Sequence, residues 1–444
     1  MSYIAPAING QVDPISLGGD NMELNRRGPK ASRRMFLKAA GGSAALWATG
    51  GIPMPAIAQT RQITVINDQS NPKAITAFAK IAAAFEAQSG VKVVINNMDH
   101  EANKTAIRNY LVAGAPDICF WFSGNRMKAF VKRNLFDDIS DLIARENLKG
   151  PLGVTIGSVT VEGKQYGLPM GGTLWGNFYL KDVFEANKLT VPTTWEETLA
   201  YGEKAKAAGL VPLAMGTKEL WPAAGFFDEL NLRINGLDTH VALMDGKLSY
   251  LDPLLTPVFD HWDQLIKADF FLPNGSSYGW QEAGALLGQK KAGMMNLGNF
   301  IKYAIPEASL PNLTFAPFPK IANVGRFEDF SVDSVHIPAN AKNKELARDF
   351  LAFFYKPDNL SSYLEPTGNI SPRSDAQPSA DPLINQALQS LKTVDGTSQY
   401  YDRDTDPDMA QVGLNAFQEY MTHPERRADI LKRLDDARKR IFKL

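Results

Sequence analysis

Cysteine is nearly absent from this chain of 444 residues, which contains Cys119 and no other. A single thiol cannot form an internal disulfide, and it excludes cysteine-based zinc sites, iron–sulfur clusters and c-type haem attachment. Histidine is also scarce, and none of the five histidines stands in an H-x-x-x-H or H-E-x-x-H spacing. We therefore expect neither a metal ion nor a cofactor.

The chain also lacks an excess of charge of either sign, because its formal net charge is only -1. Nucleic acids and anionic membranes select concentrated basic surfaces, so neither is expected as the main partner. The composition, with 44% hydrophobic and 21% charged residues, is typical of a soluble globular protein. At this length the chain should divide into two or three lobes.

A long hydrophobic run is missing, but a short one lies near the N-terminus. Residues 32–38 (SRRMFLK) precede a Gly- and Ala-rich stretch at 39–51 and a small-x-small site at 56–58 (AIA). This order predicts an export leader over residues 1–58, and the paired arginines resemble the twin-arginine (Tat) signal. The apolar stretch is shorter than the ~20 residues of a membrane span. We expect Tat-dependent export, cleavage near Gln59 and a periplasmic product.

Strand and helix patterns alternate after the leader. Apolar or β-branched runs at 62–67, 91–96 and 116–122 predict strands, and helical spacing at 74–88 and 105–113 predicts the helices between them. Alternation of this kind favours an α/β fold with mainly parallel sheets. Ligands of such sheets bind beyond the carboxyl ends of the strands. The polar or aromatic residues at those ends are therefore site candidates: Asn67, Asp68, Gln69, Asp99, His100, Trp121 and Ser123.

The rest of the chain is mostly helical in pattern. The apolar segment 166–180 is interrupted by Gly and Pro, which suits a crossing between lobes. The segment 192–197 (PTTWEE) has a threonine cap followed by acidic residues. Further helices are predicted at 223–234, 255–268, 280–290, 344–355 and 410–442.

Six segments in a fixed order resemble the family 1 extracellular solute-binding proteins of ABC importers, particularly those for sugars. They are 113–118 (AGAPDI), 166–169 (YGLP), 191–197 (VPTTWEE), 289–294 (QKKAGM), 337–351 and 368–373 (GNISPR). The resemblance implies a two-lobed periplasmic-binding-protein fold with a ligand cleft between the lobes. It places one lobe at 59–169 plus 330–373 and the other at 170–329 plus 374–444. It further implies a monomer that closes on a small ligand, here a carbohydrate, and delivers it to the transmembrane subunits of an ABC permease.

Tryptophans are candidates for the aromatic surfaces on which sugars pack, although a tryptophan is more often part of a core. Trp121 ends an apolar strand, Trp175 follows two glycines, and Trp221 lies in a loop-like stretch where the family places a cleft aromatic. We expect these three, and Trp280 after them, to face the cleft. Trp195 and Trp262 occupy ordinary helical positions and are expected to be structural; both lie outside the proposed cleft.

Several polar candidates have two interpretations. Asp99 and His100 either bind ligand or cap the following helix. Asn299 and Phe300 follow Gly298, where relatives commonly have Ser-Trp; Asn-Phe keeps a polar atom and a ring, but it leaves the exact sugar contacts open. Asp333 either reaches the cleft or pairs with a surface cation, and Arg373 either binds an acidic sugar or closes a loop.

An exported carbohydrate hydrolase is the alternative function, because it needs two carboxylates about 5 to 9 Å apart across a cleft. Asp68 with Asp99 or with Asp333 could supply them. A redox protein is a weaker alternative, since no G-x-G-x-x-G fingerprint follows a strand. A binding protein needs neither feature, and we expect no enzymatic activity.

Overall fold

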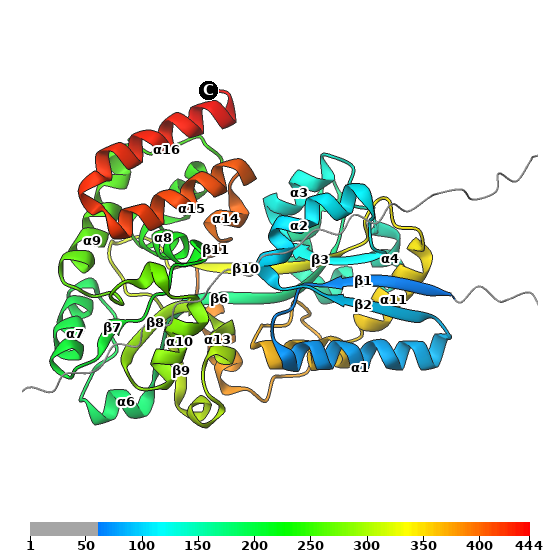
Figure 1. Ribbon diagram of the computed structural model, residues 1–444, viewed down its shortest axis with the longest axis horizontal. Coiled ribbons are helices and arrows are strands. Elements are labelled where there is room, and N and C mark those ends of the chain that lie inside the picture. Colours follow the sequence, from blue (N-terminus) through cyan, green and yellow to red (C-terminus); the bar gives the residue numbers. More distant parts are fainter. Residues whose placement is uncertain (1–60) are drawn as a thin grey trace, which may run out of the picture. The chain divides into compact units, whose positions relative to one another are not determined.

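The computed structural model describes residues 61–444, and Gln59–Leu444 form one compact unit. The predicted leader, residues 1–58, lies outside the described residues. Within the described part, strands and helices alternate along most of the chain (Figure 1).

One mixed sheet runs through the unit in the order β2-β1-β3-β10-β6-β8-β7, with β11 paired to β10 and β9 paired to β6. The pairs β1–β2, β1–β3, β7–β8 and β10–β11 are parallel, whereas β6 and β10 pair antiparallel with each other and with their other main neighbours. The strands are β1 Gln62–Asn67, β2 Lys92–Asn97, β3 Ile118–Phe122, β4 Thr160–Val161, β5 Lys164–Gln165, β6 Leu168–Leu180, β7 Val211–Leu213, β8 Ala292–Gly298, β9 Leu313–Ala316, β10 Phe327–His336 and β11 Gly396–Ser398.

Helices cover this sheet and build the periphery. They are α1 Pro72–Ser89, α2 His100–Ala113, α3 Gly124–Val131, α4 Ser140–Arg145, α5 Lys149–Leu152, α6 Lys181–Ala186, α7 Trp195–Ala207, α8 Trp221–Met244, α9 Thr256–Lys267, α10 Trp280–Gly288, α11 Lys344–Phe354, α12 Pro357–Leu364, α13 Pro382–Leu391, α14 Tyr401–Asp404, α15 Pro407–Thr422 and α16 Arg427–Phe442.

Local sequence signals explain where several elements begin and end. The side chain of Asn71 accepts a hydrogen bond from the N–H of Lys73 at the start of α1, and Gly90 ends this helix with a φ of 69°. The predicted threonine cap is confirmed, because Thr194 and Glu197 form a reciprocal capping box at the start of α7.

The single helix predicted at 410–442 is wrong. The structure has two helices there, α15 and α16, with His423 ending the first and Pro424 following it. Proline has no backbone N–H to donate within a helix, and its ring clashes with the preceding turn. The residue before a proline is also biased away from the helical region.

Two groups of buried side chains define two lobes, so the predicted two-lobed α/β fold is confirmed. The first lobe packs β1–β3, α1, α11 and α12 around aromatic residues such as Phe78, Phe120 and Phe354. The second lobe packs α7–α10, α15, α16 and β8 around a larger core that contains Trp262. Trp195 belongs to the same core, as predicted for both residues.

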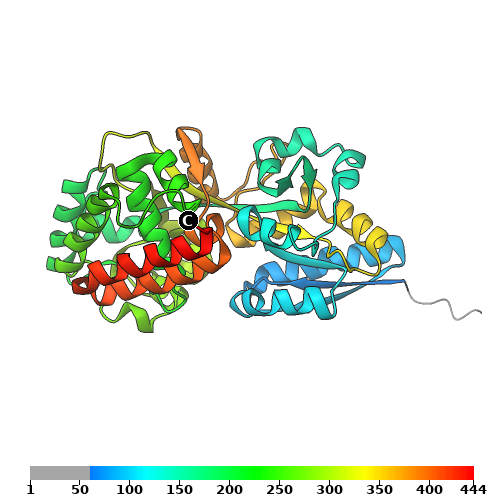
Figure 2. The same cartoon turned by 90° about the horizontal axis from the view of Figure 1, so that it is seen from above.

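The long strands β6 and β10 contribute to both lobes. Along β6, Leu168 and Met170 lie in the first core, whereas Trp175 and Phe178 lie in the second. The two strands run through the centre of the unit in both views (Figures 1 and 2). The predicted crossing segment is therefore a continuous strand.

The pairing of β6 and β10 is irregular next to a site candidate. Val332 pairs with Gly172, but the next paired residue, Ser334, pairs with Pro169, so the register shifts around Asp333. Irregularities of this kind redirect a side chain, and they recur beside functional sites.

Candidate functional site

A cavity of about 570 Å³ lies between the elements of the two lobes. The first lobe contributes the loop after β1, the start of α2, the end of β3 and residues 363–369. The second lobe contributes residues 218–225, the start of α10, Phe300, Tyr303 and residues 400–403. The middle of β6 forms part of its floor. Ligand cavities typically occupy such positions between domains.

The polar wall of the first lobe is held by the cap of α2. Asp99 accepts hydrogen bonds from the N–H groups of Glu101 (3.0 Å) and Ala102 (3.2 Å), and from the hydroxyl of Ser70 (2.9 Å). Burial alone would raise the pKa of Asp99, but these hydrogen bonds lower it below its ordinary value. Asp99 thus caps the helix, and it also lines the cavity.

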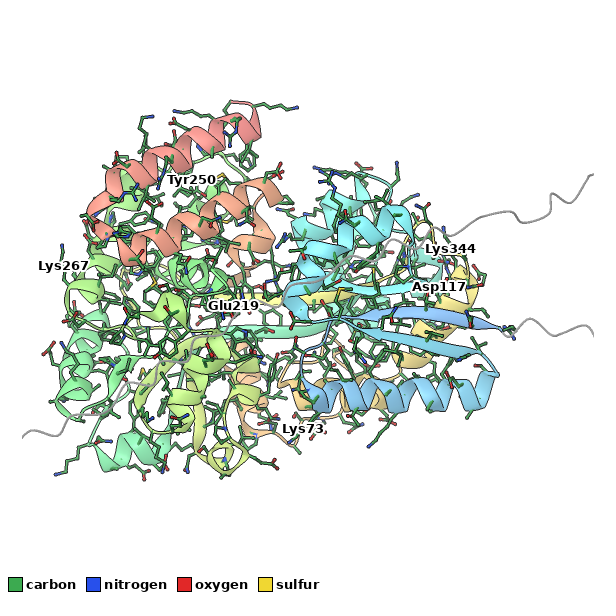
Figure 3. The ribbon with its side chains drawn as sticks, in the orientation of Figure 1. Lys73, Asp117, Glu219, Tyr250, Lys267 and Lys344 are labelled. Carbon is green, nitrogen blue, oxygen red and sulfur yellow. The ribbon has the colours of Figure 1, made fainter. Side chains whose placement is uncertain are left out.

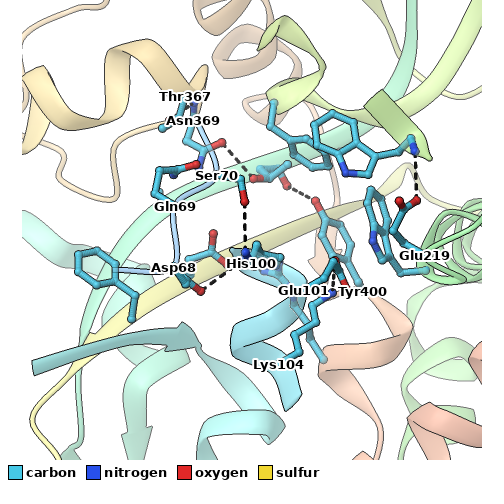
Figure 4. Close-up of a pocket in the computed structure, with 18 of the residues that line it drawn as sticks. Asp68, Gln69, Ser70, His100, Glu101, Lys104, Glu219, Thr367, Asn369 and Tyr400 are labelled. Atoms are coloured by element: carbon cyan, nitrogen blue, oxygen red, sulfur yellow. Dashed lines mark hydrogen bonds and ion pairs between the residues drawn. The ribbon is translucent and has the colours of Figure 1, made fainter. Parts of the chain in front are cut away.

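A second contact joins the loop after β1 to the same helix. The Nδ1 atom of His100 lies 3.4 Å from Oδ2 of Asp68, which also accepts a hydrogen bond from Asn103 at 3.3 Å. Figure 4 shows this contact beside Gln69 and Ser70. Asp68, Gln69, Ser70 and His100 all line the cavity and carry atoms that can form hydrogen bonds.

The wall from the second lobe is aromatic. The ring centroids of Trp221 and Trp280 are 6.1 Å apart, and Phe300 lies 5.9 Å and 5.1 Å from them. Tyr303 packs on Trp280 at 5.5 Å, and Trp175 packs on Trp221 at 6.2 Å. Because each ring is packed by others in tilted or edge-on geometry, the wall is held in one arrangement.

An ion pair forms part of the cavity lining. Arg403 donates to Asp333 at 2.8 Å, and its guanidinium lies 4.3 Å from the ring centre of Phe122 and 4.8 Å from that of Tyr400. Burial raises the pKa of Asp333, although the positive charge of Arg403 opposes this effect. Asp333 therefore lines the cavity, which is the first of the two alternatives left open by the sequence; its partner Arg403 also belongs to the cavity lining and is not a surface cation.

The structure brings together nine of the twelve residues predicted to lie at the cleft. Those that line the cavity are Asp68, Gln69, Asp99, His100, Trp121, Trp175, Trp221, Trp280 and Asp333.

The other three, Asn67, Ser123 and Asn299, are buried beside the cavity and are engaged with the protein itself. Asn67 donates to Asn97, and the hydroxyl of Ser123 donates to the carbonyl of Val332. Asn299 accepts from the N–H of Leu174 and donates to the carbonyl of Gly368. A strand-end position brings a residue near the site, but it does not decide whether the side chain faces the ligand.

Arg373 closes a loop by pairing with Asp375.

Sequence reasoning missed part of the cavity lining. The missed polar or aromatic residues are Ser70, Glu101, Lys104, Phe120, Thr173, Lys218, Glu219, Gln281, Tyr303, Tyr363, Thr367, Asn369, Tyr400, Tyr401, Asp402 and Arg403. The dense run of aromatic and charged residues at 400–404 (YYDRD) was the available signal for the last of these. Short loops such as 367–369 carry no comparable signal.

The arrangement suits an uncharged, hydroxyl-rich ligand. Carboxylates, amides and hydroxyls can exchange hydrogen bonds with hydroxyl groups, and the rings can pack on C–H faces. Arg403 is the one arginine of the described lining, and it is already paired with Asp333. Among residues 61–444, no group of three or more His, Cys, Asp or Glu side chains is arranged to hold a metal ion.

The two-lobed fold and the cavity between the lobes are typical of solute-binding proteins, and sequence comparison places the chain in the same class. Residues 69–360 match the bacterial extracellular solute-binding protein family, so the chain belongs to that family. An uncharacterized ABC transporter extracellular-binding protein of Pyrococcus horikoshii is 25% identical over 328 residues, which cover 71% of this chain and 73% of that protein.

Solved structures extend the likeness to the whole fold. The bacterial solute receptor AcbH, described as having an exclusive preference for β-D-galactopyranose, is 30% identical, with a TM-score of 0.82. The match covers 86% of this chain and 100% of AcbH. A chitin oligosaccharide binding protein has the same fold, with a TM-score of 0.79 at 20% identity over 86% of this chain and 99% of that one. In the part of this chain that the structure describes, no helix has the length and apolar character of a membrane span.

Proposed function

We propose that this protein is the substrate-binding component of an ABC importer and that it captures a small neutral sugar. A single hexose of the galactopyranose type is the first candidate ligand. The observation that carries the proposal is one cavity with a polar wall from one lobe and an aromatic wall from the other. The 30% identity to AcbH over its full length supports a monosaccharide.

Closure of the two lobes is the proposed capture step, with the ligand then passed to the membrane subunits of the permease. The proposed lobes are 59–169 plus 330–373 and 170–329 plus 374–444. Contacts that join α3 to α14 support a closed arrangement: Arg126 lies 3.5 Å from Asp402, and Asn125 donates to the carbonyl of Asp404. We further propose that residues 1–58 direct Tat export, that the mature protein is a periplasmic monomer, and that it does not alter its ligand.

Thermal unfolding against a solute panel tests this function. The full chain is expressed with its leader and recovered after export, then heated with galactose, glucose, xylose, N-acetylglucosamine, maltose or a polyol. A ligand at ~100 times its Kd stabilises the folded state by about 2.7 kcal/mol. We expect galactose to raise the Tm by a few degrees, in a concentration-dependent way.

Chromatography of the ligand after incubation provides the control. Recovery of intact sugar agrees with a binding protein, whereas cleavage of an added glycan would favour the hydrolase alternative. A protein stabilised by none of these solutes would contradict the sugar assignment. Calorimetric titration of the best solute then gives the Kd that the experiments below use.

A further inference from the structure

The chain makes an unusual reversal at Leu220, immediately before α8. Leu220 has φ 68° and ψ -44°, and the N–H of Trp221 donates to the carbonyl of Glu219 at 2.8 Å. A hydrogen bond from residue i+2 to residue i with a positive central φ defines the rare, strained form of the γ-turn. The N–H of Leu220 also donates to the carbonyl of Thr217 at 2.9 Å, so a wider turn leads into this one.

Leucine is an unfavourable residue for this conformation. A positive φ brings Cβ against the backbone, and glycine, asparagine and aspartate tolerate it best. Nine non-glycine residues of the described chain have a positive φ, and Leu220 alone among them carries a hydrocarbon side chain. Strained backbone of this kind persists where the surrounding structure enforces it, and it concentrates at functional sites.

The turn changes which side chains face the cavity. In an extended segment, neighbouring side chains point to opposite sides. Here Lys218, Glu219 and Trp221 all line the cavity. Figure 3 places Glu219 at the centre of the molecule, and Figure 4 shows it beside the aromatic wall.

A second segment, at the start of α10, holds the carboxylate in place. The N–H of Trp280 donates to Oε2 of Glu219 at 3.1 Å. A Cβ added to Gly279 would lie 2.8 Å from the other oxygen, Oε1. The same segment approaches Gly216, where an added Cβ would lie 2.5 Å from the carbonyl oxygen of Gly279. A Cβ at residue 279 would therefore press on the end of the Glu219 side chain, and the carboxylate would have to shift from its present place.

We propose that Leu220 and Gly279 are positioning residues that together fix the Glu219 carboxylate and the Trp221 ring against the bound ligand. This inference rests on the sugar-binding function proposed above and assigns one element of its specificity. Glu219 accepts a hydrogen bond from a ligand hydroxyl, while Trp221 covers a C–H face of the same sugar. Burial raises the pKa of Glu219, because only part of its hydration is replaced by protein hydrogen bonds.

Gly279→Ala is the sharpest test, since it changes no residue of the cavity lining. Gly279 has φ -67° and ψ 157°, which alanine adopts freely. The added methyl group displaces the Glu219 carboxylate, which then loses its hydrogen bond with the ligand hydroxyl. We expect the Kd for the sugar to rise about tenfold, because that is the cost of losing one hydrogen bond to a charged group. The Tm without ligand should change by no more than ~2 °C.

A double-mutant cycle separates positioning from a general disturbance. In a Glu219→Ala background there is no carboxylate to displace, so adding Gly279→Ala should leave the Kd unchanged within about twofold. A tenfold loss in both backgrounds would mean that Gly279→Ala acts through something other than Glu219, and it would overturn the proposal.

Leu220→Gly tests the turn itself. Glycine adopts this φ and ψ without strain but does not enforce them, so we expect a three- to tenfold rise in Kd without a fall in Tm large enough to indicate misfolding. Lys188→Gly is the matched control, because Lys188 has φ 53° in an exposed turn and is not part of the cavity lining. This control should bind the sugar as tightly as the wild type.

The outcomes distinguish the two proposals. A wild-type protein that binds none of the sugars would contradict the proposed function and this inference with it. A wild type that binds sugar, together with Gly279→Ala and Leu220→Gly variants of equal affinity, would contradict the positioning role alone.

Discussion

The two walls of the cavity are built in different ways. The first-lobe wall consists of strand ends and a helix cap, and its polar groups, among them Asp68 and Asp99, already hold one another by hydrogen bonds. The second-lobe wall consists of large rings, such as Trp221 and Trp280, that pack edge-on against each other. The first-lobe wall therefore provides directional hydrogen-bonding groups, and the second-lobe wall provides a large aromatic surface.

This difference predicts different roles for the two walls in binding. We expect the rings to contribute most of the affinity, because burying a large aromatic surface is worth more than one net hydrogen bond. We expect the polar wall to orient the ligand, and hence to discriminate among sugars that differ at one hydroxyl. The predictions below test that division, from the largest expected effect to the smallest.

Removal of a ring from the aromatic wall should have the largest effect. We expect Trp221→Ala to weaken sugar binding about 30- to 100-fold, or about 2 to 3 kcal/mol, measured by calorimetric titration. Trp195→Phe is the control. Trp195 lies in the second-lobe core and donates a hydrogen bond to Gln264, so this variant should lower the Tm without changing the Kd for the sugar. Equal losses from both variants would contradict the special role of the aromatic wall.

Removal of a charge from the polar wall should cost less affinity but more selectivity. We expect Asp68→Asn to raise the Kd about tenfold, or about 1.4 kcal/mol, and to narrow the ratio between the best and second-best sugar. Asp138→Asn is a control on the same lobe, because Asp138 lies outside the cavity lining and pairs with Lys164. A selectivity ratio that survives Asp68→Asn would show that the polar wall does not discriminate.

Stability should depend on pH through acids buried behind the aromatic wall. Burial raises the pKa of Glu229 on α8 well above its ordinary value, although Arg233 opposes this effect. A carboxyl group whose folded-state pKa is raised stabilises the fold below its unfolded pKa, and this contribution is lost as the pH rises through the folded value. Glu229→Gln stays neutral, so its free energy of unfolding should exceed that of the wild type increasingly from pH 5 to pH 9, by about 1 kcal/mol at most. The Tm of the variant should rise above that of the wild type over the same range.

Glu196→Gln serves as the comparison for this measurement, because Glu196 is exposed on α7. Its Tm difference from the wild type should stay flat across the same pH range. A flat difference for Glu229→Gln as well would mean that this carboxyl does not titrate as its burial requires.

The smallest effect should come from the contact that joins the lobes beside the cavity. Arg126 and Asp402 are 3.5 Å apart and mostly buried. Arg126→Gln should raise the sugar Kd by less than about fivefold, and it should reduce the dependence of Kd on salt between 20 and 500 mM. A variant with unchanged affinity and unchanged salt dependence would show that this pair does not stabilise closure.

Sequence patterns located the first lobe's elements well and the site in part. The β-branched run at 62–67 is β1 as predicted, because a buried parallel strand is continuous in hydrophobicity. The helix predicted from 105 begins at His100 instead, since Asp99 caps it and the polar first turn has weak periodicity. Tyr303 and Asn369 could not be predicted, because their place in the cavity depends on contacts between segments distant in sequence.

The sequence by itself determined the alternating elements, the near absence of cysteine and the order of segments that mark the solute-binding family. These properties are local, or they depend only on the order of residues along the chain, so they can be recognised from the sequence alone. Tertiary structure decided which strand-end residues face the ligand. The side chain of Asn67 is buried and donates a hydrogen bond to Asn97, whereas its neighbours Asp68 and Gln69 line the cavity. The strained turn at Leu220 was decided in the same way, because a conformation that leucine disfavours forms only where packing from other segments imposes it.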